Sequence, residues 1–238
     1  MRRFDFLIIF SLILFSGSGF YETIACNSLS SYLNRSDQDT IPDKQILYNG
    51  RVWRDLYNTV LGDQYLFSTE FLPGSVIING KDFKDLKIRY DIYNDEIITI
   101  TDNGIVIQLN KEMVDMFTIT YLKVVHQFIN LQSDSVNKIS GYVDVIYNGN
   151  TPLYFKYKKE INIPDIAQKY ETFYQKREIY ILRDEILHQI KNKRDLKGLL
   201  SDKKVQIKKF IKSYSLYGLK KTPEIIVPVL KHYDSLSR

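Results

Sequence analysis

"DLKIRYDIYNDEIITI", Asp85 to Ile100, alternates apolar and polar side chains on both sides of a turn signal. A period of two predicts a pair of β-strands with one apolar face. If Asn94 and Asp95 form a two-residue turn, Tyr93 opposes Glu96 and Ile92 opposes Ile97. The side chains expected to point into a core are then Ile88, Tyr90, Ile92, Ile97 and Thr99.

The same alternation runs through residues 46–182, for example in "PLYFKYKKEI" from Pro152 to Ile161. Asn, Asp and Gly recur between the alternating segments, as in "INGKD" from Ile78 to Asp82, because hairpin turns need positive φ. Short strands without long intervening helices predict a mainly β domain. We expect an antiparallel meander with one solvent-exposed face that curls into a barrel, a half-barrel or a sandwich.

The polar face of the first hairpin carries the strongest chemical candidate. The predicted register makes Asp91 and Glu96 diagonal neighbours, roughly 7 to 8 Å apart. Such a pair can act on a water molecule in a hydrolase, together with a histidine. It can equally be a solvated pair balanced by Arg89, with Asp95 serving only the turn. The residues favour this second, structural interpretation, since nothing in the pattern implies burial.

Other catalytic signals are weak. The three histidines, His126, His188 and His232, lie on distant segments without metal-binding spacing, and neither a nucleophile elbow nor a phosphate-binding loop is present. No cofactor is therefore expected. Trp53, the sole tryptophan, is expected to be a buried anchor; flanked by Arg51 and Arg54, it could instead be an exposed stacking platform for sugars.

The N-terminus follows the order of a secretory signal. Arg2 and Arg3 precede the apolar run "FLIIFSLILF", which is too short to span a bilayer. We expect residues 1–25 to be a signal peptide, cleaved after Gly19 or Ala25, and residues 26–45 to be a flexible leader. Cleavage after Ala25 would leave the only cysteine, Cys26, first in the mature chain, as in a lipoprotein.

Residues 183–238 are basic, with 14 Lys or Arg against 6 Asp or Glu. The helical period in "DKKVQIKKFIKSYSL" predicts an amphipathic helix from Asp202 to Leu216, capped by Ser201 or Asp202. A second helix is expected over residues 220–236, with Thr222 as cap and a bend or interruption at Pro228. We expect this helical subdomain to pack on the sheet. Its lysines could also contact an anionic lipid surface or a polyanion: Lys203, Lys204, Lys208, Lys209 and Lys212.

Several stretches resemble a family of uncharacterised exported proteins of the Bacteroidetes. The similar stretches are "YNGRVWRDLY", "GDQYLFSTEFLPGSVIING", "LKIRYDIYNDEIITI", "IQLNKEMV", "LLSDKKVQIKKFIKSYSL" and "VLKHYDSL". The resemblance spans about residues 46–236. It implies an exported, β-rich protein with a short helical tail, and no activity, cofactor or catalytic residue is established for the family.

Together these patterns favour a non-enzymatic binding or structural protein of the cell envelope. We expect it in the periplasm or at the outer membrane, with an apolar ligand or an envelope protein as partner. Export makes nucleic acid an improbable target. A hydrolase built from Asp91, Glu96 and a histidine, and a lipid-surface or polyanion contact through the lysine-rich helix, are the alternatives.

Overall fold

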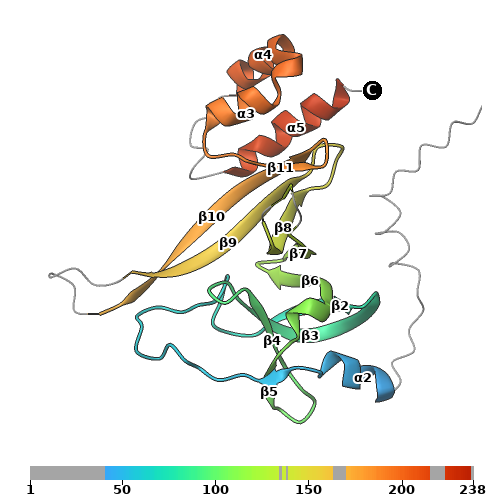
Figure 1. Ribbon diagram of the computed structural model, residues 1–238, viewed down its shortest axis with the longest axis vertical. Helices are drawn as coiled ribbons and strands as arrows, with labels where there is room; N and C mark the ends of the chain where they lie inside the picture. The colour runs from blue at the N-terminus through green and yellow to red at the C-terminus, as the bar shows by residue number, and fades with distance from the viewer. Residues whose placement is uncertain (1–40, 134–135, 138, 163–169, 215–222, 237–238) are drawn as a thin grey trace, which may run out of the picture. The chain divides into compact units, whose positions relative to one another are not determined.

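A single antiparallel sheet of eleven strands dominates the computed structural model, which describes residues 41–133, 136–137, 139–162, 170–214 and 223–236 (Figure 1). The strand order across the sheet is β1-β5-β4-β3-β2-β6-β7-β8-β9-β10-β11. The strands are β1 (Arg51–Val52), β2 (Leu72–Ile78), β3 (Lys81–Asp91), β4 (Glu96–Ile100), β5 (Val106–Gln108), β6 (Val114–Tyr121), β7 (Val124–Leu131), β8 (Gly141–Tyr147), β9 (Leu153–Asn162), β10 (Thr172–Arg183) and β11 (Ile186–Gln189).

Two meanders make up this sheet. Strands β2 to β5 follow one another outward from the middle, strands β6 to β11 follow one another in the other direction, and β2 pairs with β6 where the two meet. The antiparallel meander is therefore confirmed. The sheet does not close into a barrel, because its edge strands β1 and β11 are not paired with each other within the described residues.

The C-terminal helices are α3 (Lys193–Leu199), α4 (Lys204–Tyr214) and α5 (Ile226–Ser235), and the 3-10 turns η2 (Ser201–Lys203) and η3 (Pro223–Ile225) directly precede α4 and α5. Their apolar residues, among them Leu196, Ile207 and Val229, belong to the same buried cluster as the strand residues Leu153 and Ile181. The helices thus bury their apolar faces against the sheet. Two further short elements are α2 (Ile41–Leu47) and η1 (Lys111–Met113). None of the helices in the described ranges has the length and apolar content of a membrane span.

Two expected details of these helices are wrong. Neither Ser201 nor Asp202 caps the helix, because both lie within η2, whose N-cap position is Leu200 without a side-chain cap hydrogen bond, and α4 begins only at Lys204. The Asp202 carboxylate instead accepts a hydrogen bond from the Tyr233 hydroxyl at 2.8 Å and pairs with Arg183 at 3.0 Å. Pro228 does not interrupt α5, because it lies in the first helical turn, where no backbone N–H is needed. The expected cap Thr222 lies outside the described residues.

The hairpin of β3 and β4 has the predicted inward face but a different register. Asp91 pairs directly with Glu96 and Tyr90 with Ile97, so residues 92–95 form a four-residue loop in place of the predicted two-residue turn. The register shifts by two positions, and an even shift leaves every side chain on its predicted face. The five residues predicted to point inward are all at most 2% exposed: Ile88, Tyr90, Ile92, Ile97 and Thr99.

The opposite face of this hairpin is covered, contrary to the expected solvent exposure. Asp91 is 1% and Ile98 0% exposed. The segment 53–71 lies against the hairpin and is held by backbone hydrogen bonds of 2.9 Å from Leu66 to Tyr90 and from Ile92 to Gln64. Sequence alternation describes a strand with one wet face, and it does not reveal when a distant loop covers the other face.

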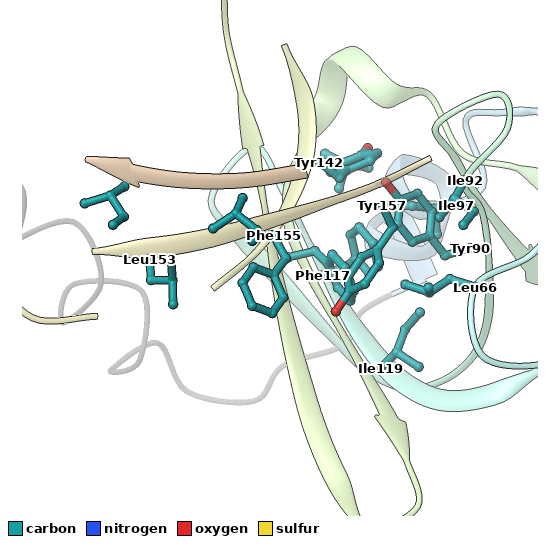
Figure 2. Close-up of a cluster of buried hydrophobic side chains, with 14 of the residues drawn as sticks. Leu66, Tyr90, Ile92, Ile97, Phe117, Ile119, Tyr142, Leu153, Phe155 and Tyr157 are labelled. Atoms are coloured by element: carbon teal, nitrogen blue, oxygen red, sulfur yellow. The ribbon is translucent and has the colours of Figure 1, made fainter. Parts of the chain in front are cut away.

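Aromatic rings fill the centre of the core (Figure 2). The ring of Tyr90 lies edge-on to Phe117, Phe128 and Tyr142, with centroid distances of 5.1, 5.3 and 5.8 Å. These rings come from β3, β6, β7 and β8, so they join the two meanders. The core therefore fixes the position of the β3–β4 loop, which contributes residues to two pockets.

Candidate functional site

Three of the residues singled out in the sequence line one small pocket. Trp53, Asp91 and Glu96 border a pocket of about 240 Å³, here called the Trp53 pocket. Other residues in its lining are Arg51, Arg54, Tyr57, Asn94 and Gln108. The fourth candidate, Arg89, lies behind the tryptophan, with its Cζ atom 4.9 Å from the indole centroid.

Asp91 organises the hairpin loop. Its Oδ1 atom accepts hydrogen bonds from the backbone N–H groups of Tyr93 and Asn94, each at 2.9 Å, and its Oδ2 atom accepts one from the Asn94 side chain at 2.8 Å. Burial raises the pKa of Asp91 above its ordinary value, and the hydrogen bonds from Asn94 and Tyr93 oppose that rise. The loop function that the sequence assigns to Asp95 therefore belongs to Asp91.

Glu96 lies directly across the ladder from Asp91 and not diagonally as predicted. Its carboxylate pairs with Arg51 at 3.1 Å, and the Arg51 Nε atom also donates to Gln108 at 2.9 Å. Burial raises the pKa of Glu96, the Arg51 charge lowers it, and the neighbouring Asp91 raises it further. Glu96 thus has a different counter-ion from the expected Arg89.

Arg89 is held by aromatic rings in place of Asp91. Its guanidinium carbon is 4.1 Å from the Tyr65 centroid and 4.5 Å from that of Phe71, and its Nη1 atom donates to the Thr69 carbonyl at 3.0 Å. The buried Nε atom has no hydrogen-bond partner within the described part of the chain. Cation–π attraction to three rings compensates for removing this charge from water.

The carboxylate pair does line a concave pocket, as a hydrolase would require, but the rest of the arrangement does not fit acid–base chemistry. Both oxygens of Asp91 are engaged in the loop, and no histidine is among the described lining residues. His126 instead bonds the buried Asp144 at 2.9 Å, and the ring of His232 stacks on Phe210 at 4.3 Å.

A larger pocket lies on another side of the same loop. It has a volume of about 660 Å³, and we call it the Lys156 pocket. The loop contributes Ile92, Tyr93 and Asp95; β9 contributes Lys156 to Glu160; and the remaining lining residues are Val136, Asn137, Ile139, Ser140, Tyr180 and Leu187. The volume falls in the range of about 300 to 1,000 Å³ that is typical of small-molecule sites.

Asp95 and Lys156 form a largely buried ion pair in this pocket. Their side chains are 22% and 6% exposed, and the Asp95 Oδ2 atom lies 3.3 Å from the Lys156 Nζ atom and 2.6 Å from that of Lys111. Its Oδ1 atom accepts a hydrogen bond of 2.5 Å from the Tyr90 hydroxyl. Lys156 also donates to the Ser140 carbonyl at 2.7 Å.

Asp95 and Lys156 each favour the charged form of the other against the cost of burial. Burial alone would raise the pKa of Asp95, but the Lys156 charge and the hydrogen bonds from Lys111 and Tyr90 hold it below its ordinary value. Burial lowers the pKa of Lys156, although Asp95 opposes this effect. Perturbed ionisable groups that meet in a pocket are a recognised signature of functional sites.

The basic helix α4 places four of the five predicted contact residues in solvent: Lys204, Lys208, Lys209 and Lys212. Lys203 is the exception, because its ammonium lies over the Tyr233 ring at 4.6 Å. Ile207 and Ile211 are buried, as the helical period predicts.

Within the described ranges, no group of three or more His, Cys, Asp or Glu side chains could hold a metal ion. The expected signal peptide and Cys26 lie outside those ranges.

Lys156 was not among the site residues expected from the sequence, and Asp95 was expected to serve only the turn. Alternation put Lys156 on a wet face of β9, yet it is only 5% exposed. A lysine between two aromatic residues in "YFKYKK" was the only available signal.

Comparisons with models of protein families, with curated proteins and with solved structures find no significant match to this chain. The resemblance to exported proteins of the Bacteroidetes therefore stays a prediction.

Proposed function

We propose that this chain is an exported binding protein of the cell envelope, and that the Lys156 pocket takes a small polar ligand with an acidic group. One observation carries the proposal: the Asp95–Lys156 pair is buried at the wall of a pocket of ligand size. Removing both charges from water is costly, and an apolar pair of the same volume often gives equal or greater stability. A binding function accounts for charges kept at this position.

The charge of the lining favours an acidic ligand over the apolar one expected from sequence. Three lysines, Lys156, Lys158 and Lys159, line the pocket beside Asp95 and Glu160, and each lysine is paired with a carboxylate: Asp95, Glu178 and Asp63 respectively. Lys158 is the most accessible of the three, since its side chain is 40% exposed in its ion pair with Glu178. A carboxylate or phosphate can exchange with Glu178 at Lys158 without breaking the buried pair.

Binding without chemical conversion is the simplest function for this site. The buried amine of Lys156 is occupied by Asp95 and by the Ser140 carbonyl. The hydroxyl of Tyr157 donates to Asp144 at 3.3 Å, and that of Tyr180 donates to Glu178 at 3.0 Å. These groups are arranged to satisfy one another and to orient a ligand at the rim.

Thermal unfolding with defined probes tests the proposal. Citrate and inorganic phosphate should raise Tm in a saturable way, whereas glycerol at the same concentration should not. Lys158→Glu should abolish the rise, and the matched reversal Lys209→Glu on the exposed face of α4 should retain it. An equal response in both variants, or saturable binding of the uncharged apolar dye Nile red with no response to citrate or phosphate, would contradict an acidic ligand.

The expected location has a separate test. Cleavage after Ala25 with lipid on Cys26 predicts a mature chain whose intact mass exceeds that of the peptide by a diacylglyceryl and an acyl group. Cleavage after Gly19 predicts the unmodified peptide mass. An uncleaved chain recovered from the cytoplasm would overturn the proposal of export while leaving the pocket proposal intact.

A further inference from the structure

We propose that the Trp53 pocket is a second binding site, for one sugar ring that carries an acidic group. The inference does not depend on the function proposed for the Lys156 pocket. It rests on three features that converge in the smaller pocket: a fixed indole, an unpaired guanidinium and a set of hydrogen-bond acceptors. Each feature matches one part of a uronic acid, namely its C–H face, its carboxylate and its hydroxyl groups.

The indole of Trp53 is partly exposed and is held from behind. Arg89 lies over the ring at 4.9 Å, and Tyr65 packs beside it with a centroid distance of 6.5 Å. The backbone N–H of Trp53 also donates to the Val106 carbonyl at 3.0 Å, which ties the residue to the edge of the sheet. A ring with a fixed orientation presents apolar area without a large loss of side-chain entropy, as stacking on the C–H face of a sugar requires.

Arg54 provides the selectivity for an acid. It is exposed at the pocket and has no hydrogen-bond or ion-pair partner within the described part of the chain. Arg51, by contrast, is already engaged by Glu96 and Gln108. A free guanidinium matches the geometry of a carboxylate and can bind it through two parallel hydrogen bonds.

The remaining lining residues suit hydroxyl groups. The side-chain oxygens of Glu96 and Gln108 each accept a hydrogen bond from Arg51, and that of Asn94 accepts one from the Tyr57 hydroxyl at 3.2 Å. Since a carboxylate or amide oxygen can accept more than one hydrogen bond, a sugar hydroxyl can donate to the remaining lone pairs. A volume of about 240 Å³ is smaller than a typical drug-sized site, so the pocket holds one ring and not a longer ligand. Since Asp91 is engaged in the loop, the site binds the sugar and does not hydrolyse it.

The sole tryptophan makes the test specific to this pocket. The full chain is titrated with D-glucuronate while the fluorescence of Trp53 is recorded, with D-glucose, AMP and sodium sulfate at matched ionic strength as comparison probes. We expect a saturable change with glucuronate, with Kd on the order of 1 mM for a single sugar. Glucose should bind about tenfold more weakly, because it lacks the charge-assisted pair with Arg54.

Variants separate the contributions. Arg54→Gln should reduce glucuronate affinity to that of glucose, whereas Lys158→Gln, in the Lys156 pocket, should leave it unchanged. An oligogalacturonate that binds more tightly than D-galacturonate would identify one ring of a polymer as the ligand, and equal affinity would identify a free monosaccharide. The proposal is overturned if Arg54→Gln has no effect, if glucose binds equally well, if AMP binds more tightly, or if sulfate alone reproduces the signal.

Discussion

Asp91 and Glu96 face each other directly across β3 and β4, yet their carboxylates serve different partners. Asp91 accepts three hydrogen bonds within the hairpin loop, whereas Glu96 reaches Arg51 on the edge strand. The first carboxylate is buried and the second is paired with an arginine whose side chain is 73% exposed. Asp91 is therefore engaged within the loop, whereas Glu96 joins β4 to an exposed arginine at the edge of the sheet.

Replacing these two residues should separate the roles. Asp91→Ala should destabilise the fold by about 1 to 3 kcal/mol, because two backbone N–H groups of the loop lose their acceptor. Glu96→Ala should cost much less, since it breaks a pair with an exposed arginine. Urea unfolding of both variants measures the difference. Equal losses would show that the hairpin loop does not depend on Asp91.

The pH dependence of stability should reveal the contribution of the Asp95 carboxylate. Its pKa is lowered in the folded state, so its stabilising contribution is present above the unfolded value of about 3.9 and is lost as pH falls through the folded value. Asp95→Asn leaves Lys156 buried without its counter-ion and should cost about 3 kcal/mol at pH 7. The difference in the free energy of unfolding between the variant and the natural chain should shrink as the pH falls from 4 to the folded pKa of Asp95.

Urea unfolding at several pH values checks this expectation. Asp102→Asn is the matched control, because Asp102 pairs with Lys44 in solvent, with side chains that are 62% and 50% exposed. The free energy of unfolding of Asp102→Asn should differ little from that of the natural chain at any pH. If the difference in unfolding free energy between Asp95→Asn and the natural chain is constant from pH 7 to pH 3, the lost stability comes from packing and not from the charge.

The sequence was sufficient for the inward face of the first hairpin but not for its polar face. Alternation reports which side chains share a face, and a two-residue error in register preserves that parity. The burial of Asp91 depends on the segment 53–71, and the burial of Lys156 depends on Asp95, which lies 61 residues earlier. Local patterns contain no information on such distant coverage, so both pockets could be found only from the fold.

Gly141 should be essential for the ion pair. Its φ is +89°, and a Cβ atom there would overlap the Asp95 carboxylate and lie 2.9 Å from the Lys156 Nζ atom. Gly141→Ala should therefore cost at least about 2 kcal/mol, from backbone strain together with displacement of the pair. Thermal and urea unfolding provide the measurement.

Gly104→Ala separates the two causes. Gly104 has a similar φ of +78°, but nothing lies within 4 Å of the added Cβ atom. It should show only the backbone cost, about 1 to 2 kcal/mol. If both glycines tolerate alanine equally, the position of Gly141 against Asp95 is not important for stability.

His126 should stabilise the fold by satisfying a buried carboxylate. Asp144 is 1% exposed, and its Oδ2 atom is 2.9 Å from the His126 Nδ1 atom. His126→Phe keeps a ring against Phe67, whose centroid lies 4.4 Å away, but removes the nitrogen. A loss of about 1 to 3 kcal/mol is expected in chemical unfolding. His188→Phe on the edge strand β11 is the control, and a loss of the same size there would argue against a specific role for Asp144.

The turn between β6 and β7 should carry removable strain. Leu122 and Lys123 adopt φ of +48° and +66°, a conformation that favours Asn and Gly, and Leu122 is 78% exposed, so its side chain contributes little burial. The turn between β2 and β3 has the favoured residues Asn79 and Gly80 at φ of +49° and +75°. Replacing Leu122 by Asn and Lys123 by Gly should stabilise the protein by about 1 to 2 kcal/mol.

The reverse exchange provides the matched comparison. Asn79→Leu with Gly80→Lys should destabilise the protein by a similar amount, because it places two side chains in the left-handed region. In thermal unfolding, each kcal/mol should move Tm by about 2 to 4 °C in a domain of this size, upward for the first variant and downward for the second. A fall in Tm for the first variant would show that Leu122 is held by contacts that outweigh its backbone strain.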